Sequence, residues 1–283
     1  MVQLDDSVSV GTGVIFRADG YILTNYHVLA GGRDCTVAMD TGRTYEARYV
    51  AGDERNDLAV LKVELTGLPA ATFGDSDQLV VGDKVYAIGN PLGVELRGTL
   101  TDGIVSAINR DVQVDGRTMT LVQTNAALNS GNSGGPLFDQ YGSVVGIVSA
   151  KYTQSTSGVS AEGLGFALPI NDVKEIIADL IEHGYVTGKP YMGVQVDSVA
   201  SEAQRYGIPA GAAVSYVADG SCAQKAGLQV NDVITAIDDT TIDSPSALTA
   251  ALSTGYKAGD TATLTVIRNQ QEVKLTITFD EKN

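Results

Sequence analysis

The sequence GNSGGPL at residues 131–137 places Ser133 on a glycine-rich turn. Glycine lets the backbone bend sharply there, and the apolar runs 136–138 and 144–148 that follow predict a pair of strands. A serine hydroxyl is a weak nucleophile at neutral pH. It needs a base that takes its proton and a third group that orients this base.

Of the two histidines in the chain, one precedes this serine and one follows it. His27 comes directly after short apolar runs, and we expect it at a strand end. His183 ends an amphipathic helix expected over residues 172–183, just before Gly184. A cation complements the helix dipole at that end, and glycine readily adopts the left-handed backbone conformation that terminates a helix. We therefore interpret His183 as a helix end and His27 as the candidate base.

Asp57 is the candidate third group because it opens the apolar run DLAVL at residues 57–61. Such a run predicts a strand with the carboxylate at its rim, where it can meet the histidine. Asp53 and Glu54 are rival carboxylates, and the alternative interpretation of Asp57 itself is a solvated turn residue.

The pattern Gly-x-Ser-x-Gly also fits the nucleophile turn of α/β-hydrolases. In those enzymes the acid and then the histidine follow the serine. Here only His183 follows it. The order histidine, aspartate, serine is the order of chymotrypsin-like serine proteases, and the sequence favours that arrangement.

Four motifs, in order and spacing, resemble the signatures of the HtrA (Deg) family of trypsin-like proteases. They are TNYHV (24–28), DLAVL (57–61), GNSGGPL (131–137) and GLGFALP (163–169). The resemblance covers nearly the whole chain. It implies a mainly β fold, with a two-barrel chymotrypsin-like protease domain followed by a smaller α+β PDZ domain.

The resemblance also implies the roles of the site residues. His27 is then the general base and later the general acid, Asp57 orients it, and Ser133 forms the acyl-enzyme. The backbone N–H groups of Gly131 and Ser133, with Asn132, are expected to form the oxyanion hole. We expect a serine endopeptidase that cleaves unfolded or misfolded polypeptides in bacterial protein quality control and the stress response.

Substrate binding is expected at two further segments. Ser149, Ala150 and Lys151 match the strand with which trypsin-like enzymes pair the substrate backbone. Leu128, together with Leu164 and Gly165, would line the specificity pocket.

Ala127 lies six positions before the nucleophile, where a tryptic enzyme requires a buried aspartate. We therefore expect cleavage after small or medium aliphatic residues such as Val, Ala, Leu or Ile.

Three features bear on regulation. Asn125 stands where the family commonly has aspartate, and the lost charge is expected to affect the order of its loop. The Ser, Thr and Gly-rich stretch 151–162 is long for a loop and lies beside the expected pocket. Arg117 best matches a family arginine that senses activation, and the alternative interpretation is a solvated turn arginine.

The domains are expected at residues 1–184 for the protease and 191–283 for the PDZ domain, with a linker at 185–190. Tyr191, Met192, Gly193 and Val194 resemble the loop with which PDZ domains of this family bind a peptide C-terminus. On its own this run would indicate a plain strand.

Downstream features support the PDZ interpretation. Residues 226–234 resemble a PDZ core segment, and Ser244 and Pro245 predict the start of a helix. The alternating runs 261–267 and 272–279 predict a closing hairpin around Asn269.

Composition limits the classes of partner. The net charge of −15 and the isoelectric point near 4.4 argue against nucleic-acid binding, because phosphates would be repelled. Cys35 and Cys222 fall in different expected domains, so we expect no disulfide framework. Neither the histidines nor the cysteines have metal-ligand spacing, and we expect no metal and no cofactor.

The resemblance implies an extracytoplasmic location, periplasmic or at the cell surface, with membrane anchoring through an earlier segment. Family members also carry an earlier strand that contributes to trimer contacts. We therefore expect a homotrimer for the full-length protein and weaker trimerisation of this chain. Two rival functions are a non-proteolytic scaffold for unfolded chains and a hydrolase that uses the same serine on other substrates.

Overall fold

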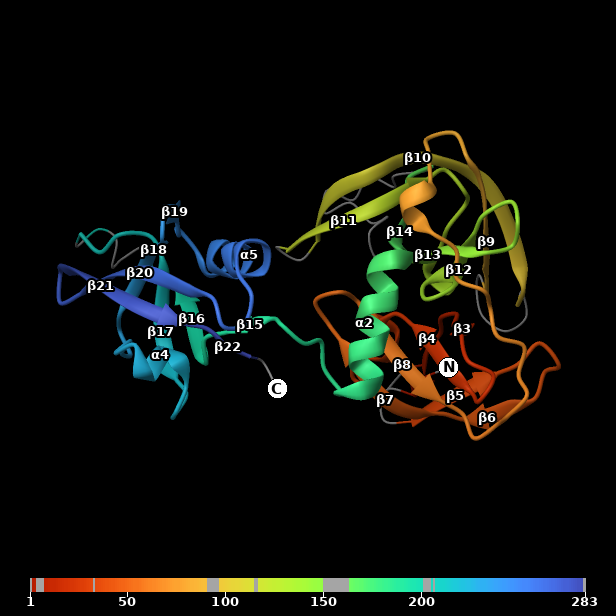
Figure 1. Ribbon diagram of the computed structural model, residues 1–283, viewed down its shortest axis with the longest axis horizontal. Coiled ribbons are helices and arrows are strands. Elements are labelled where there is room, and N and C mark those ends of the chain that lie inside the picture. Colours follow the sequence, from red (N-terminus) through yellow and green to blue (C-terminus); the bar gives the residue numbers. More distant parts are fainter. Residues whose placement is uncertain are drawn as a thin grey trace. The chain divides into compact units, whose positions relative to one another are not determined.

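The computed structural model describes residues 2–3, 8–32, 34–90, 97–114, 117–149, 163–200, 205 and 207–281. These residues fall into two compact units that divide between Val186 and Thr187, inside the segment 185–190. We refer to them as the first and the second unit (Figure 1). The predicted mainly β fold is confirmed in both.

The first half of the first unit consists of short antiparallel strands. Its described strands form two sheets, in the orders β3-β4-β8-β7 and β2-β1-β5-β6. Their bounds are β1 Val2–Gln3, β2 Val8–Ser9, β3 Val14–Ile15, β4 Tyr21–Thr24, β5 Asp34–Ala38, β6 Thr44–Glu46, β7 Arg48–Asp53 and β8 Leu58–Lys62. A helical turn, α1 (Tyr26–Leu29), follows β4 directly.

The second half of the first unit is a closed barrel with the order β10-β11-β14-β13-β12-β9. Its strands are β9 Lys84–Gly89, β10 Thr99–Val114, β11 Arg117–Thr124, β12 Pro136–Phe138, β13 Val144–Val148 and β14 Gly165–Pro169. Buried and more exposed residues alternate along β9, as expected for a strand with one face in a core. The turn between β11 and β12 carries Ser133 and contains a short 3₁₀ helix, η3 (Ser130–Asn132).

Helix α2 (Ile170–Glu182) packs against strands from both halves, including β8 and β13 (Figure 1). Its buried residues, spaced by three or four positions, are Ile170, Val173, Ile177 and Leu180. Each such side chain contributes about 1.5–3 kcal/mol on burial. The helix starts two residues earlier than predicted, because Ser76 Oγ accepts the hydrogen bond of the Asn171 N–H in its first turn. It ends where expected, with Gly184 in the left-handed region at φ 82°.

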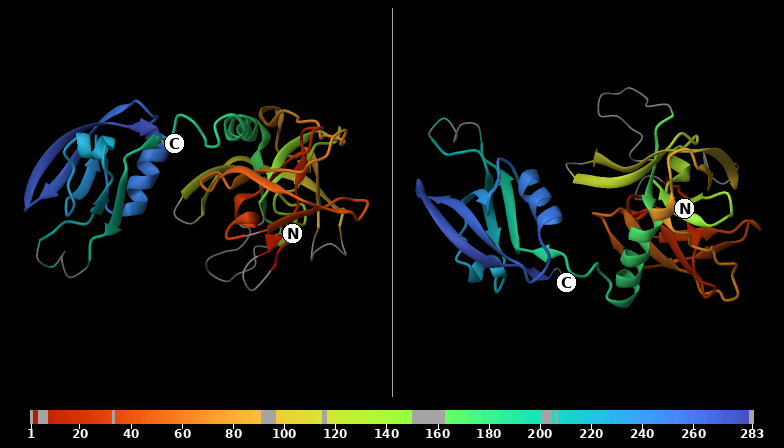
Figure 2. Two further views of the ribbon diagram at one scale, coloured as in Figure 1. Left: turned by 90° about the horizontal axis from the view of Figure 1, so that it is seen from below. Right: turned by 45° about the horizontal axis from the view of Figure 1, so that its top comes forward.

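The second unit is built on an antiparallel sheet with the order β16-β17-β18-β20-β21. Its strands are β15 Pro190–Tyr191, β16 Val194–Ser198, β17 Ala212–Val217, β18 Val233–Ile237, β19 Thr240–Thr241, β20 Thr261–Arg268, β21 Gln271–Thr278 and β22 Asp280–Glu281. Helix α5 (Pro245–Gly255) lies beside β16, the edge strand of this sheet (Figure 2). The Ser244 hydroxyl accepts the hydrogen bond of the Ala247 N–H, as the predicted helix start requires.

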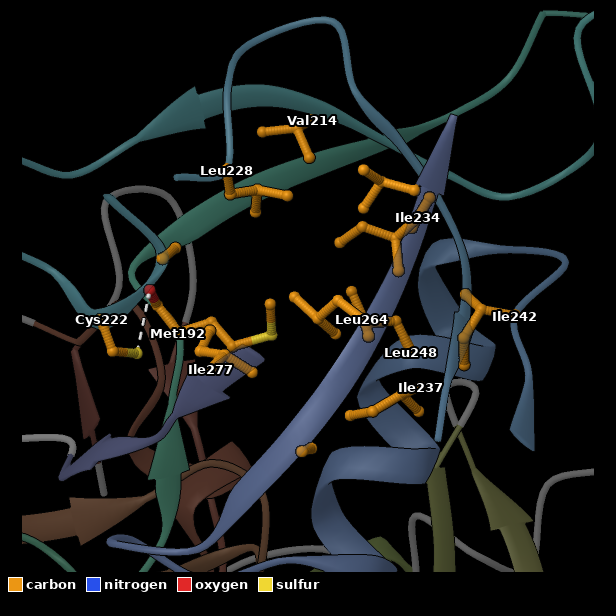
Figure 3. Close-up of a cluster of buried hydrophobic side chains, with 14 of the residues drawn as sticks. Met192, Val214, Cys222, Leu228, Ile234, Ile237, Ile242, Leu248, Leu264 and Ile277 are labelled. Atoms are coloured by element: carbon orange, nitrogen blue, oxygen red, sulfur yellow. Dashed lines mark hydrogen bonds between the residues drawn. The ribbon is translucent and has the colours of Figure 1, made fainter. Parts of the chain in front are cut away.

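The core of the second unit lies between the sheet, α5 and the short helix α4 (Cys222–Lys225), as Figure 3 shows. Ile234, Ile237, Leu264 and Ile277 are fully enclosed there. Leu248 of α5 points into the same cluster. Among the described residues, no helix is long and apolar enough to cross a membrane.

Candidate active site

His27 and Asp57 form a directly hydrogen-bonded pair. Nδ1 of His27 lies 2.8 Å from Oδ2 and 2.9 Å from Oδ1 of Asp57, and the His27 backbone N–H also donates to Oδ1. The pairing of β4 with β8 sets Thr24 opposite Ala59, which brings the end of one strand beside the start of the other. His27 itself lies in the helical turn α1 after β4, and not at the strand end that the sequence predicted.

Asp57 adopts an uncommon backbone conformation for a residue with a side chain. Its φ of 52° lies in the left-handed region, where aspartate is tolerated better than most residues. Nδ2 of Asn25 donates a hydrogen bond to the backbone carbonyl oxygen of Asp57 at 2.9 Å, and Asn25 is fully buried. Asn25 therefore helps to fix the backbone that aims the carboxylate at His27. Sequence reasoning missed this role, although Asn25 belongs to the same motif as the histidine.

Ser149 contributes a third donor to the same carboxylate. Its hydroxyl donates to Oδ2 of Asp57 at 3.0 Å, and its side chain is buried. Its backbone N–H donates to the carbonyl oxygen of Phe166, which joins it to β14. The sequence predicted Ser149 as a substrate-binding residue through its backbone and gave no sign of this side-chain contact.

The nucleophile turn packs directly on the segment that leads to His27. The Gly134 N–H donates to the carbonyl oxygen of Val148, the residue before Ser149, at 2.9 Å. Gly134 has a φ of 82°, and a Cβ added there would lie 2.9 Å from the backbone nitrogen of Asn25. These contacts place the residue after Ser133 beside Asn25 and beside Val148, which flank His27 and Ser149.

Thr12 joins the first half of the unit to this turn. Its N–H donates to the carbonyl oxygen of Ser133 at 2.8 Å, and its hydroxyl donates to that of Gly131 at 2.7 Å. The Thr12 hydroxyl also accepts from the Asn90 N–H at 3.1 Å. Sequence reasoning missed Thr12, because its bonds to Gly131 and Ser133 join residues more than a hundred positions apart and no local pattern shows them.

The N–H groups that are predicted to form the oxyanion hole all donate their hydrogen bonds to acceptors within the turn itself. Ser133 donates to the carbonyl oxygen of Ser130 at 3.3 Å and Asn132 to that of Asn129 at 2.9 Å. Gly131 donates to the side-chain oxygen of Asn129 at 3.2 Å. Oxyanion stabilisation requires donors aimed at the substrate, so the turn must rearrange before these groups can act.

Two residues of the predicted specificity pocket lie together. A Cβ added at Gly165 would lie 2.6 Å from Cδ1 of Leu128. The Leu128 side chain therefore packs against Gly165 in space that a larger residue at position 165 would fill. Leu164 points outward and is 42% exposed, whereas Phe166 belongs to the core of the unit. The Ala127 carbonyl oxygen accepts the hydroxyl of Thr101 at 3.0 Å.

Several predicted residues lie outside the described part of the chain. Ala150 and Lys151 fall there, as does the stretch 151–162. The backbone of Arg117 opens β11, but its side chain is not described. Asn125 is described, and its Oδ1 accepts the Ile104 N–H at 2.8 Å. An amide oxygen can serve as that acceptor without the charge of an aspartate.

In the second unit, Met192 and Gly193 form a tight connection between β15, which ends at Tyr191, and β16, which begins at Val194. Gly193 has a φ of 73°, and a Cβ added there would collide with Cβ of Ser221. The Gly193 carbonyl oxygen accepts the Ala218 N–H at 2.8 Å, and the Sγ of Cys222 donates to the Tyr191 carbonyl oxygen at 3.0 Å. The loop is therefore held from behind, and it leads into the edge strand β16.

Burial raises the pKa of the Cys222 thiol in this second unit, and it also raises the pKa of the half-buried Cys35 thiol in the first. Both cysteines are free thiols. In the described residues, no group of three or more His, Cys, Asp or Glu side chains is arranged to hold a metal ion.

Comparison with known proteins agrees with this arrangement. The chain matches the family model of the trypsin-like peptidase domain over residues 11–147 and that of the PDZ domain over residues 190–279.

Among curated proteins, the chain is 36% identical to the serine protease Do-like HtrA of Lactobacillus helveticus, over 97% of this chain and 69% of that protein. It is 39% identical to the probable periplasmic serine endoprotease DegP-like of Halomonas elongata, over 96% of this chain and 56% of that protein. The chain thus spans between 56% and 69% of the length of these two relatives.

Solved structures give the same result. The HtrA-type protease AlgW with decapeptide superposes with a TM-score of 0.68 at 38% identity, over 97% of this chain and 83% of that one. A serine endoprotease from Yersinia pestis gives a TM-score of 0.67 at 32% identity, over 100% of this chain and 93% of that one. The chain belongs to the HtrA (Deg) family of serine proteases, in which a trypsin-like peptidase domain precedes a PDZ domain.

Proposed function

We propose that the chain is a serine endopeptidase that cleaves unfolded or misfolded polypeptides through an acyl-enzyme on Ser133. The observation that carries this proposal is the His27–Asp57 pair, with Nδ1 and Oδ2 2.8 Å apart, beside the buried nucleophile turn. The two further bonds on Asp57, from the His27 N–H and the Ser149 hydroxyl, support its role as the orienting group.

The reaction follows from which ring nitrogen Asp57 holds. Because Nδ1–H of His27 donates to the carboxylate, Nε2 is the nitrogen that accepts a proton. Ser133 Oγ gives its proton to Nε2 and attacks the substrate carbonyl carbon, whose oxygen becomes an oxyanion. The tetrahedral intermediate expels the amine, which takes the proton from Nε2, and the acyl-enzyme remains.

Water completes the turnover. It gives a proton to Nε2 and its oxygen attacks the ester carbonyl carbon. The second intermediate expels Ser133 Oγ, which takes the proton back, and the carboxylic acid product leaves.

The N–H groups of Gly131 and Ser133, with Asn132, are proposed to stabilise both oxyanions. Loss of one such donor costs about 2.7–4 kcal/mol of transition-state stabilisation. We call the observed conformation, in which these N–H groups donate to acceptors within the turn, the closed turn. Activity then requires that the hydrogen bond from the Ser133 N–H to the Ser130 carbonyl oxygen breaks.

Substrate selection is proposed to favour small or medium aliphatic residues. Leu128 packed against Gly165 makes this region apolar, and Ala127 offers no carboxylate for a basic residue. The backbones of Ser149, Ala150 and Lys151 are proposed to pair with the substrate. Cleavage-site profiling on a mixed peptide library tests this preference, and cleavage mainly after Lys or Arg contradicts it.

The second unit is proposed to bind peptide C-termini for recruitment or regulation in protein quality control. The loop Tyr191–Val194 would receive the terminal carboxylate, and the peptide would add a strand to the edge of β16 beside α5. The peptide-bound AlgW structures support peptides as the class of partner.

An extracytoplasmic location is proposed from relatives whose names place them in the periplasm. A homotrimer is proposed for the full-length protein. Light scattering at low micromolar concentration tests this, since a monomeric mass contradicts it.

A fluorophosphonate probe combined with an unfolded substrate separates the proposed function from its two rivals. We expect the probe to label Ser133 and the enzyme to cut casein, with both results lost in Ser133→Ala. Labelling without peptide cleavage indicates a non-proteolytic hydrolase, and the absence of both indicates a scaffold. Casein cleavage that persists in Ser133→Ala shows that another nucleophile acts.

A further inference from the structure

The turn around Ser133 is anchored unevenly. The carbonyl oxygens of Gly131 and Ser133 are both held by Thr12, at 2.7 and 2.8 Å. The Gly134 N–H is held by the Val148 carbonyl oxygen at 2.9 Å. These bonds tie the middle and the end of the turn to neighbouring strands on either side.

The peptide between Ser130 and Gly131 is held in another way, by bonds within the turn. Its N–H donates to Oδ1 of Asn129 at 3.2 Å, and its carbonyl oxygen accepts the Ser133 N–H at 3.3 Å. Asn129 thus acts as the N-cap of η3, with an extended backbone at φ −144° and ψ 177°. We call the bond from Gly131 N–H to Asn129 Oδ1 the Asn129 cap.

The Asn129 cap and an open oxyanion hole exclude each other. If the Ser130–Gly131 peptide rotates so that its N–H faces the substrate, that N–H leaves Asn129. The same rotation withdraws the Ser130 carbonyl oxygen from the Ser133 N–H, which frees the second donor. One peptide rotation therefore breaks the cap and presents both donors, and glycine at position 131 permits it.

The closed turn also carries an opposing cost. Within the described part of the structure, Oδ1 of Asn132 is buried and has no hydrogen-bond partner. A buried acceptor without a partner destabilises the state that contains it. The Asn129 cap stabilises the closed state, and loss of the cap would therefore shift the balance towards the open state.

We infer that Asn129 is a positioning residue whose side chain sets how often the oxyanion hole is open, by capping the closed form of the nucleophile turn. The inference rests on the proposed peptidase function and deepens it, because it assigns the resting activity of the site to one side chain. Asn129 is exposed, so its replacement leaves the core of the unit intact.

The test compares Asn129→Ala with Asn129→Ser in the full chain, because serine caps helices about as well as asparagine and alanine does not. The control is Asp75→Ala. Asp75 caps a second described 3₁₀ helix of this unit, η1 (Ser76–Gln78), by accepting the Asp77 N–H at 3.1 Å. Each variant is measured for kcat/KM on a short chromogenic peptide and for the rate of Ser133 labelling by a fluorophosphonate, and thermal melting reports the fold.

We expect Asn129→Ala to raise kcat/KM and the labelling rate together by about 2- to 30-fold, the population shift that loss of an N-cap produces. Asn129→Ser and Asp75→Ala should stay near the wild-type values. If the wild type is active and Asn129→Ala is folded but no faster, the inference is wrong and the peptidase function stands. An equal gain in Asp75→Ala shows general loosening and also overturns it. If no variant is labelled and none cuts peptide, the proposed function fails and the inference fails with it.

Discussion

The hydroxyl of Ser149 donates a hydrogen bond to Oδ2 of Asp57 over 3.0 Å and so joins residues 92 positions apart in the sequence. Asp57 comes from the first half of the first unit, and Ser149 directly follows β13 in the second half. With the two bonds from His27, the buried carboxylate accepts hydrogen bonds from three donors. These three bonds restrain the orientation of the carboxylate and of the imidazole that it holds.

Replacement of Ser149 by alanine is expected to lower kcat by about tenfold or more without a comparable change in KM. A hydrogen bond to a charged group is worth about 1.5–3 kcal/mol, and its loss leaves Oδ2 of Asp57 with His27 Nδ1 as its remaining donor. Steady-state kinetics on a peptide substrate measure the effect. Ser76→Ala, which removes a buried hydroxyl that contacts Asn171 N–H in the same unit, is the matched control. An unchanged kcat in folded Ser149→Ala would show that the contact has no part in catalysis.

Asp57→Asn should lower kcat by about 10⁴-fold, the cost known for this change in trypsin-type triads, because the amide no longer fixes the imidazole tautomer. Ser133→Ala should cost about 10⁴-fold or more. Both variants should bind a C-terminal peptide as the wild type does, since the second unit is untouched. Active-site titration and fluorescence anisotropy with a labelled peptide measure the two properties side by side. Loss of peptide binding in either variant would argue against independent sites.

Gly193→Ala is expected to weaken binding of a peptide with a free C-terminal carboxylate by at least about tenfold. The new Cβ would meet Ser221, and alanine at a φ of 73° costs about 1–2 kcal/mol in backbone strain. Gly220→Ala is the matched control, because its φ is 74° and no atom lies within 4 Å of its Cβ position. Anisotropy measured with free and with amidated peptides reports the carboxylate contribution. Equal losses in both variants would mean that strain alone is responsible.

Asp232→Ala should destabilise the second unit by about 1.5–3 kcal/mol, since it removes a buried carboxylate that accepts charge-assisted hydrogen bonds from Arg268. Asp232 is 1% exposed and accepts two bonds of 2.7 Å from Arg268 and one of 2.8 Å from the Gln229 N–H. Chemical denaturation of the full chain measures the loss. In the surface pair Arg17–Asp19, with side chains 47% and 44% exposed, Asp19→Ala should cost about 0–1 kcal/mol. Similar losses at both places would contradict the role of burial.

Alkaline stability should depend on Tyr256. Burial and the hydrogen bond from its hydroxyl to Asp238 raise the pKa of Tyr256 from 10.0 to about 12. A raised pKa in the folded state stabilises the protein below the unfolded pKa, and this stabilisation is lost as the pH rises from about 10 to about 12. The difference in unfolding free energy between the wild type and Tyr256→Phe should therefore shrink across this window. Tyr141→Phe, at a side chain 83% exposed, is the control, and a difference independent of pH would refute the assignment.

Local patterns predicted the elements that depend on local chemistry. The start of α5 at Ser244 and Pro245, the hairpin that turns at Asn269, and the end of α2 at Gly184 follow from capping and turn preferences that act within a few residues. His27, Asp57 and Ser133 were identifiable because their residue types and order define a known chemistry.

The remaining features depend on contacts between distant segments. Nothing near Thr12 or Asn25 in the sequence indicates a bond to Gly131 or to Asp57, because the partners belong to segments that are distant in the sequence. The turn at Ser133 is closed by the Asn129 cap and by the bond from the Ser133 N–H to the Ser130 carbonyl oxygen, and the residue types alone do not show which way the Ser130–Gly131 peptide faces. Leu164 was predicted to line a pocket; it lies directly before β14 and is 42% exposed, and its part in substrate binding stays a prediction.

His27 and Asp57 belong to the first half of the first unit and Ser133 to the second, so neither half alone contains all three proposed catalytic residues. The bonds from Thr12 to Gly131 and Ser133 join the two halves. No atom lies within 4 Å of the position that a Cβ on Gly67 would take. If the chain were cut after Gly67, one fragment would carry the imidazole of His27 and the other the hydroxyl of Ser133. Neither piece should hydrolyse peptides by itself, and a mixture should gain activity with the product of the two concentrations. The protease domain would then serve as a split reporter of its own reassembly.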